Sequence, residues 1–202
     1  MLEAPVVIVF ASHDGQTAKI ISYLERQLAH KKCAALVCDL GQMSIPSFVL
    51  ETASAVVVVS PIRYGRHLLK VETFLEEYKP LLKRMRLGMA SVNLTARKPN
   101  KNTPQTNPYF KKWVKRHGLS PDIGAVFGGR LDYPKYRWMD RQMIRFIMMI
   151  TGGPTHPRTR LEYTCWADVA RFAAQIEALA DGAGAESFWQ AEEEERDLAI
   201  WA

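Results

Sequence analysis

The chain has 202 residues, of which 48% are hydrophobic and 24% are charged, an ordinary composition for a globular protein. This length suffices for one sizeable hydrophobic core and is short for two. No stretch approaches the roughly 20 consecutive apolar residues that a membrane-spanning helix requires. The three cysteines, Cys33, Cys38 and Cys165, lack CxxC spacing and cannot all pair, which favours a reducing compartment over a disulfide framework or a zinc site. The five histidines show no metal spacing either, so we assign no metal site.

The net charge of +6 is spread unevenly along the chain. Residues 66–116 contain thirteen Lys or Arg against three Glu, whereas residues 183–202 contain six acidic residues and one Arg. A basic body suits nucleic acid, an anionic membrane or an acidic small molecule, and composition does not choose among them. The N-terminus has Glu3 and no basic leader, so it is typical of a first strand rather than a signal peptide.

The apolar pattern predicts alternating strands and helices. Strands are expected at residues 6–11, 34–40, 53–60, 87–94 and 122–128. Helices are expected at 16–30, at 68–80 with Pro80 as its end, from either Thr103-Pro104 or Asn107-Pro108, and at 166–180 with Thr164 as its cap. This order is typical of a parallel α/β sheet with helices on both faces.

Two stretches lie outside that alternation. One is a long insertion, residues 130–163, between the fifth strand and the last helix; the other is the acidic tail, residues 183–202. We therefore expect one domain, residues 1–182, that carries the insertion and is followed by a mobile tail.

The first expected strand runs into a polar loop with the components of an anion site. This loop supplies hydroxyls, a glycine and the first free N–H groups of a helix, at the positive end of the helix dipole. Its residues are Ser12, His13, Asp14, Gly15, Gln16 and Thr17. They would equally serve an ordinary helix start capped by Ser12 or Asp14. Neither GK[ST] nor GxGxxG is present, which argues against a nucleoside triphosphate or a dinucleotide.

Two further loops are expected to meet the first, because ligands of open α/β sheets bind at the carboxyl ends of the strands. After the third strand, Ile62 and Tyr64 can face a flat ring, and Gly65 permits close backbone approach. After the fourth strand, backbone amides and Asn93 can hydrogen-bond a polar ring edge. One phosphate and one flat heterocycle are the layout for FMN. The expected FMN-binding residues of these two loops are Pro61, Ile62, Arg63, Tyr64, Gly65, Ser91, Asn93, Leu94, Thr95, Ala96 and Arg97.

The three loops and the insertion together resemble a known family. VIVFASHDGQT is similar to the flavodoxin-type phosphate loop, although that motif alone is weakly specific. SPIRYG, SVNLTARKPNKNTPQTN and RLDYPKYRWMDRQMIRFIMMITGG resemble the flavodoxin-like, quinone-dependent protoporphyrinogen dehydrogenases of bacterial haem biosynthesis, over about residues 5–181. The resemblance implies a doubly wound, five-stranded parallel sheet of order 2-1-3-4-5 with an insertion after strand 5.

The resemblance also implies a reaction. The cofactor would be FMN, and protoporphyrinogen IX would be oxidised to protoporphyrin IX. Electrons would pass to menaquinone or ubiquinone at the cytoplasmic face of the bacterial cell membrane. Flavin N5 would carry the chemistry, so no catalytic side chain is assigned.

A porphyrinogen is a large apolar macrocycle with two propionates, so its site needs apolar area and one or two cations. Arg63, Arg97, Arg130 and Arg137 all lie at loop positions near the expected flavin edge. Of these, Arg63, Arg130 and Arg137 are the candidates for the propionates, because the planar guanidinium can bind a carboxylate bidentately. Tyr64 and Tyr133 are the candidates for stacking on the macrocycle or the flavin. Each of these residues has an alternative role, as a surface arginine or a packing aromatic residue.

The insertion contains a basic amphipathic helix. Arg137, Arg141 and Arg145 share one side, and the other side is apolar. At about 14 residues and 1.5 Å per residue this helix is too short to span a membrane. It can lie on an anionic membrane surface, or its apolar side can cover the sheet. The expected membrane contacts are Trp138, Met139, Met143, Phe146, Ile147 and Ile150.

Three other functions stay open on sequence grounds. A flavodoxin-like electron carrier would hold FMN without oxidising porphyrinogen, and an NAD(P)H:quinone reductase would accept electrons from a nicotinamide. A nucleic-acid-binding role is disfavoured because the basic stretches lack a recognisable motif. The sequence also leaves open whether the chain forms a homo-oligomer.

Overall fold

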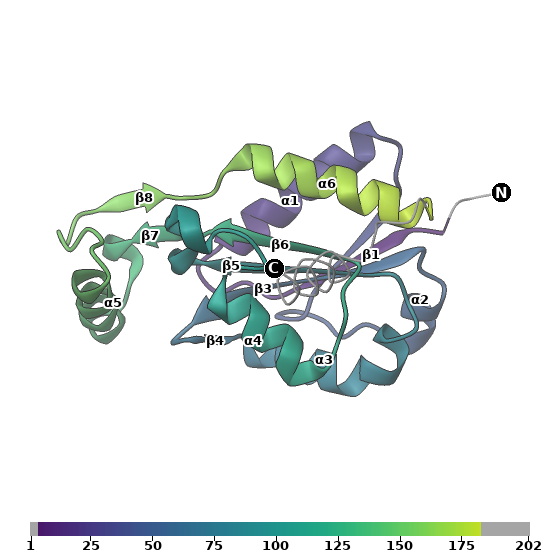
Figure 1. The fold of residues 1–202 in the computed structure, drawn as a ribbon, viewed down its shortest axis with the longest axis horizontal. Coiled ribbons are helices and arrows are strands. Elements are labelled where there is room, and N and C mark those ends of the chain that lie inside the picture. The colour runs from purple at the N-terminus through teal and green to yellow at the C-terminus, as the bar shows by residue number, and fades with distance from the viewer. Residues whose placement is uncertain (1–3, 183–202) are drawn as a thin grey trace, which may run out of the picture.

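The computed structural model describes residues 4–182, and the acidic tail lies outside these residues. Five parallel strands in the order β2-β1-β3-β5-β6 form its centre (Figure 1). They are β1 (Val6–Phe10), β2 (Ala35–Asp39), β3 (Ala55–Arg63), β5 (Leu87–Asn93) and β6 (Ile123–Gly128). Apart from β4 (Arg66–His67), which pairs only with β3, this is the expected 2-1-3-4-5 order. The prediction of a flavodoxin-like sheet is confirmed.

Helices cover both faces of this sheet, which explains the continuous apolar runs in its strands. On one face lie α1 (Gln16–His30) and α6 (Trp166–Ala180) (Figure 1). On the other lie α2 (Ser47–Glu51), α3 (Leu69–Leu82) and α4 (Pro108–His117). Alternate residues of β1 enter the two cores: Ile8 packs in the core beneath α1 and α6, and Val9 packs in the core beneath α3 and α4.

Some helix ends differ from the expected ones. The second candidate start is correct for α4, because the Asn107 side chain accepts hydrogen bonds from the N–H groups of Tyr109 and Phe110, and Pro108 occupies the first helical position. Pro80 does not end α3, which continues to Leu82. In the last turn a proline removes only one hydrogen bond, so the helix tolerates it there. The short helix α2 replaces part of an expected loop.

The predicted side-chain caps are realised only in part. The residue before α1 is Gly15, but the Ser12 hydroxyl accepts from the Ala18 N–H in the first turn of the helix at 3.4 Å, as one of the two predicted caps would. Thr164 does not cap α6; its hydroxyl donates to the Gly128 carbonyl at 2.6 Å and accepts from the Gln16 amide at 2.9 Å. Thr164 therefore joins β6 to the start of α1 instead of capping the start of α6.

Strand β3 continues past its expected end at Pro61 and returns as a hairpin. Arg63 pairs with Arg66, and the two residues between them, Tyr64 and Gly65, have φ values of 51° and 76°. Two adjacent residues at positive φ are typical of the tight turn that joins twisted antiparallel strands. The hairpin therefore carries Arg63 and Tyr64 beyond the edge of the parallel sheet.

The insertion folds into a small unit of its own. It contains β7 (Arg130–Asp132), α5 (Trp138–Ile150) and β8 (Arg160–Glu162), with β7 and β8 antiparallel. Leu131, Tyr133, Tyr136 and Met148 form a small core within it. The unit lies beyond the carboxyl ends of the sheet strands (Figure 1). Among residues 4–182, no helix has both the length and the apolarity that crossing a membrane requires.

Candidate functional site

One pocket lies at the carboxyl edge of the sheet, between the three loops and the insertion. Its cavity volume is about 220 Å³. The structure brings together most of the residues expected there: His13, Asp14, Gln16, Thr17, Pro61, Ile62, Arg63, Tyr64, Gly65, Asn93, Leu94, Thr95, Arg97 and Arg130. Helix α5 closes one side with Met143, Ile144, Ile147 and Met148.

The loop before α1 is built to receive an anion. The first-turn N–H groups of a helix have no intrahelical partner. In this helix the Ala18 N–H donates to the Ser12 hydroxyl at 3.4 Å, and no acidic residue lies in the first turn. Gly15 has φ of 86°, and a Cβ atom added at this position would have no other atom within 4 Å. The backbone conformation, rather than a lack of space, therefore requires glycine here. Gln16 and Thr17 are buried beside it and line the pocket. A phosphate fits this loop.

A buried polar network holds the loop after β5. Asn93 accepts from the Ala96 N–H at 3.0 Å and from the Asn107 amide at 3.2 Å, and it donates to the Ser91 hydroxyl at 3.1 Å. Its amide therefore bonds mainly within the protein. The carbonyls of residues 93–95 also accept bonds from the protein, and all three residues line the pocket. Ser91 and Ala96 do not line the pocket; they position this loop from behind.

His67 forms the base of the same network. Its Nε2 lies 3.0 Å from the Ser91 hydroxyl, and its ring stacks on Trp113 with 3.9 Å between centroids. Burial lowers the pKa of His67 to about 3, with the nearby Arg116 and His117 adding to the shift. The imidazole is therefore neutral at physiological pH.

The mouth of the pocket carries a cluster of polar side chains. The Arg63 guanidinium donates to the Asp140 carboxylate at 2.8 Å and to the Tyr64 hydroxyl at 3.2 Å. The Tyr64 hydroxyl also donates to Asp140, and His13 contacts Arg63 from the loop before α1. Three elements distant in sequence thus meet over the pocket.

The candidate cations have different neighbours. Arg97 bonds to the Leu94 carbonyl at 3.0 Å and to the Thr151 hydroxyl at 2.7 Å, so it joins the loop after β5 to the end of α5. Arg130 lines the pocket and pairs with Asp132 at 2.8 Å. Arg137 is exposed at the N-cap of α5, away from the pocket lining, so the structure does not bring it to the expected substrate site.

The expectation that Tyr133 stacks on a ligand is wrong. Its side chain is fully buried in the core of the insertion, and its hydroxyl donates to the Pro154 carbonyl at 2.8 Å. Tyr136 lines the pocket instead, and burial raises the pKa of its phenol. No spacing rule separates two tyrosines three residues apart on a turn, so the sequence could not choose between them.

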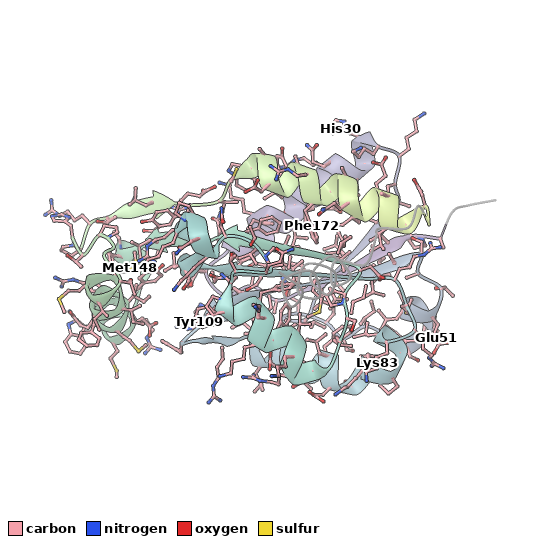
Figure 2. The ribbon with its side chains drawn as sticks, in the orientation of Figure 1. His30, Glu51, Lys83, Tyr109, Met148 and Phe172 are labelled. Carbon is pink, nitrogen blue, oxygen red and sulfur yellow. The ribbon has the colours of Figure 1, made fainter. Side chains whose placement is uncertain are left out.

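Other lining residues were missed by the sequence reading. They are Val92, Tyr109, Gly129, Tyr136, Asp140, Ile144, Met148 and Thr151. Ile144 and Met148 lie four residues apart, so helical spacing carried a signal for the inward face of α5. Tyr109 and Met148 approach the same end of the molecule from α4 and α5 (Figure 2).

The outer face of α5 is apolar and exposed. Its exposed residues are Trp138, Met139, Met143, Phe146, Ile147, Met149 and Ile150. Arg141 and Arg145 turn inward, where they donate to the Tyr133 carbonyl at 3.0 Å and the Thr155 carbonyl at 2.9 Å. The alternative in which this apolar face covers the sheet is therefore wrong. A contiguous patch of this kind marks an interaction surface.

Comparison with known proteins shows which family the chain belongs to. The flavodoxin domain family matches residues 7–158. The chain is similar to the Escherichia coli (strain K12) protein named Protoporphyrinogen IX dehydrogenase (quinone), with 41% identity over 175 residues, which are 87% of this chain and 96% of that protein. It is 37% identical over 174 residues to the Leishmania major protein of that name, covering 86% of this chain and 74% of that protein. Its fold is similar to that of oxidised flavodoxin 1 from Bacillus cereus, with a TM-score of 0.50, 11% identity and coverage of 86% and 97%.

The fold and the three-loop pocket define a flavodoxin-type flavoprotein oxidoreductase. Within the flavodoxin domain family, the chain belongs to the quinone-dependent protoporphyrinogen IX dehydrogenases.

Proposed function

We propose that this chain binds FMN and oxidises protoporphyrinogen IX to protoporphyrin IX, with quinone as the electron acceptor, in haem biosynthesis. The observation that carries the proposal is one pocket that joins an anion-binding loop to an apolar wall and three arginines. Two relatives with that activity in their names align over most of the chain. The reaction removes six electrons from the macrocycle.

The residues of the three loops fit FMN. Gly15, Thr17 and the first N–H groups of α1 would hold the phosphate. The hairpin at Tyr64 and Gly65 and the backbone of residues 93–95 would hold the flat ring from two sides. Bound FMN supplies the redox chemistry, accepting electrons from the substrate and releasing them to quinone.

The other residues of the pocket have the chemistry that a porphyrinogen requires. Ile144 and Met148 offer apolar surface, and flexible methionine side chains adapt to a large ring. Arg63 and Arg130 line the same pocket and would bind propionates through the guanidinium fork. The protein therefore contributes orientation and charge complementarity to the reaction.

We also propose that α5 rests on the cytoplasmic face of the membrane. The insertion that carries this exposed apolar face also has exposed basic residues, namely Lys135, Arg137, Arg158 and Arg160. Apolar side chains flanked by Lys and Arg suit the surface of an anionic bilayer. Met143 and Ile147 belong both to this face and to the pocket, so a lipid-dissolved menaquinone or ubiquinone would have a short route to the flavin.

One anaerobic assay tests the activity. Protein loaded with FMN is mixed with protoporphyrinogen IX and a quinone, and porphyrin fluorescence is followed. We expect fluorescence to rise only when protein, flavin and quinone are all present. Absence of the signal from flavin-loaded protein would overturn the proposal in favour of an electron carrier. Bleaching of the flavin by NAD(P)H, without porphyrin formation, would indicate an NAD(P)H:quinone reductase.

A further inference from the structure

Asp140 places a carboxylate beside Arg63, one of the two arginines proposed to bind the substrate. Its Oδ2 accepts from Arg63 Nη2 at 2.8 Å, and its Oδ1 accepts from the Tyr64 hydroxyl. Asp140 lies in the first turn of α5, so this contact joins the insertion to the hairpin that follows β3. All three side chains line the pocket.

We infer that Asp140 is an internal competitor for Arg63, and that a carboxylate of the substrate displaces it on binding. The inference rests on the proposed function, because it takes a porphyrinogen propionate as the incoming group. Arg63 and Tyr64 would then recognise that propionate with the same donors that Asp140 now occupies.

The ion pair between Arg63 and Asp140 lies where an incoming carboxylate can replace Asp140. The side chains of Arg63 and Asp140 are 25% and 17% exposed, so water and ligands reach them from the pocket mouth. Partly exposed ion pairs are weak, because solvent screens them and competes for their hydrogen bonds. The pair of Arg130 differs, since the Asp132 side chain is only 5% exposed and lies on the same strand. Of these two pocket arginines, Arg63 is the one whose partner can leave.

Arg63 stays oriented when its partner leaves. Its guanidinium carbon lies 4.9 Å from the centre of the Tyr64 ring, a cation–π arrangement that does not involve Asp140. Helix α5 is likewise held by other contacts, from Arg141 and Arg145 to carbonyls of the insertion and from Arg97 to Thr151. Displacing Asp140 therefore frees a preformed carboxylate site without unfolding the insertion.

Substitution of an ordinary binding residue weakens ligand binding, whereas substitution of Asp140 is expected to strengthen it. Removing the charge of Asp140 should strengthen the binding of a dicarboxylate porphyrin, because the porphyrin no longer competes with an internal carboxylate and no longer approaches a like charge. The gain should be confined to porphyrins that carry free carboxylates. A purely structural ion pair would show the reverse, since its loss would loosen the pocket.

The experiment titrates flavin-loaded protein with protoporphyrin IX and, in the same detergent, with its dimethyl ester, and follows binding by fluorescence. Asp140→Asn should bind the diacid about fivefold more tightly than the parent and the ester equally, a gain in the range expected for an exposed ion pair. Asp168→Asn is the matched control, because it makes the same charge change at an exposed pair with Arg171 on α6. It should bind both porphyrins as the parent does.

A second pair of variants completes the cycle. Arg63→Gln should weaken diacid binding, and Asp140→Asn should tighten that binding less in the Arg63→Gln background than in the parent, because Asp140 competes chiefly for Arg63. The inference is wrong if Asp140→Asn binds the diacid as the parent does or more weakly, or if it tightens the ester equally. If the parent binds neither porphyrin, the proposed substrate itself is wrong, which is a separate result.

Discussion

His67 should make the stability of the protein fall in mildly acidic solution. Its side chain is 7% exposed, and its pKa is lowered from 6.5 to about 3 in the folded state. Below pH 6.5 the imidazole of His67 is protonated in the unfolded chain but not in the folded chain. The free energy of unfolding therefore decreases as the pH falls from 6.5 toward 3. Because one pKa unit corresponds to about 1.4 kcal/mol, lowering the pH from 7.5 to 5.5 should cost about 1.4 kcal/mol through this residue.

The measurement compares urea unfolding of the parent and of His67→Gln at both pH values. The variant loses the Trp113 stack, so it should be less stable at pH 7.5. Its deficit should shrink by about 1.4 kcal/mol at pH 5.5, because glutamine does not titrate. His156→Gln, the same change at an exposed histidine, is the matched control. A deficit for His67→Gln that is equal at the two pH values would refute the reasoning.

Three further predictions address the cofactor, the membrane and the fold. Gly15→Val should weaken FMN binding at least tenfold, because a β-branched residue at φ of 86° costs roughly 2 kcal/mol or more. Retention of FMN on gel filtration measures this effect, and equal retention by the parent and the variant would contradict the phosphate-loop assignment. Phe146→Glu should reduce flotation with anionic liposomes, whereas Phe48→Glu, the same change at an exposed Phe on α2, should not; equal flotation of both variants would remove α5 as the anchor. Gly128→Ala should destabilise the protein by about 2 kcal/mol in urea unfolding, because the new Cβ would lie 2.3 Å from the Tyr163 carbonyl oxygen. Gly129→Ala meets nothing closer than 3.7 Å and should cost less, so equal loss in the two variants would refute the steric explanation.

The strands of the sheet, most of its helices and the position of the anion-binding loop follow from local patterns in the sequence. Runs such as residues 6–10 and 55–59 are apolar at every position, and that pattern suits only strands covered on both faces. Asn107 followed by Pro108 is a local start signal that acts through backbone groups two and three residues away. Such interactions are local, so they can be inferred without knowing the fold.

The contacts that complete the rim of the pocket join residues far apart in the sequence, so they depend on the folded structure. Asp140 meets Arg63 across 77 positions of the chain, and Thr164 meets Gln16 across 148. The sequence indicated Arg63 as a candidate for binding a carboxylate, but no local pattern predicts that Asp140 is its partner in the folded protein. Likewise, Tyr136 rather than Tyr133 faces the pocket because Tyr133 is buried in the small core of the insertion. Contacts of this kind depend on where separate elements pack, so their partners are defined only once the chain has folded.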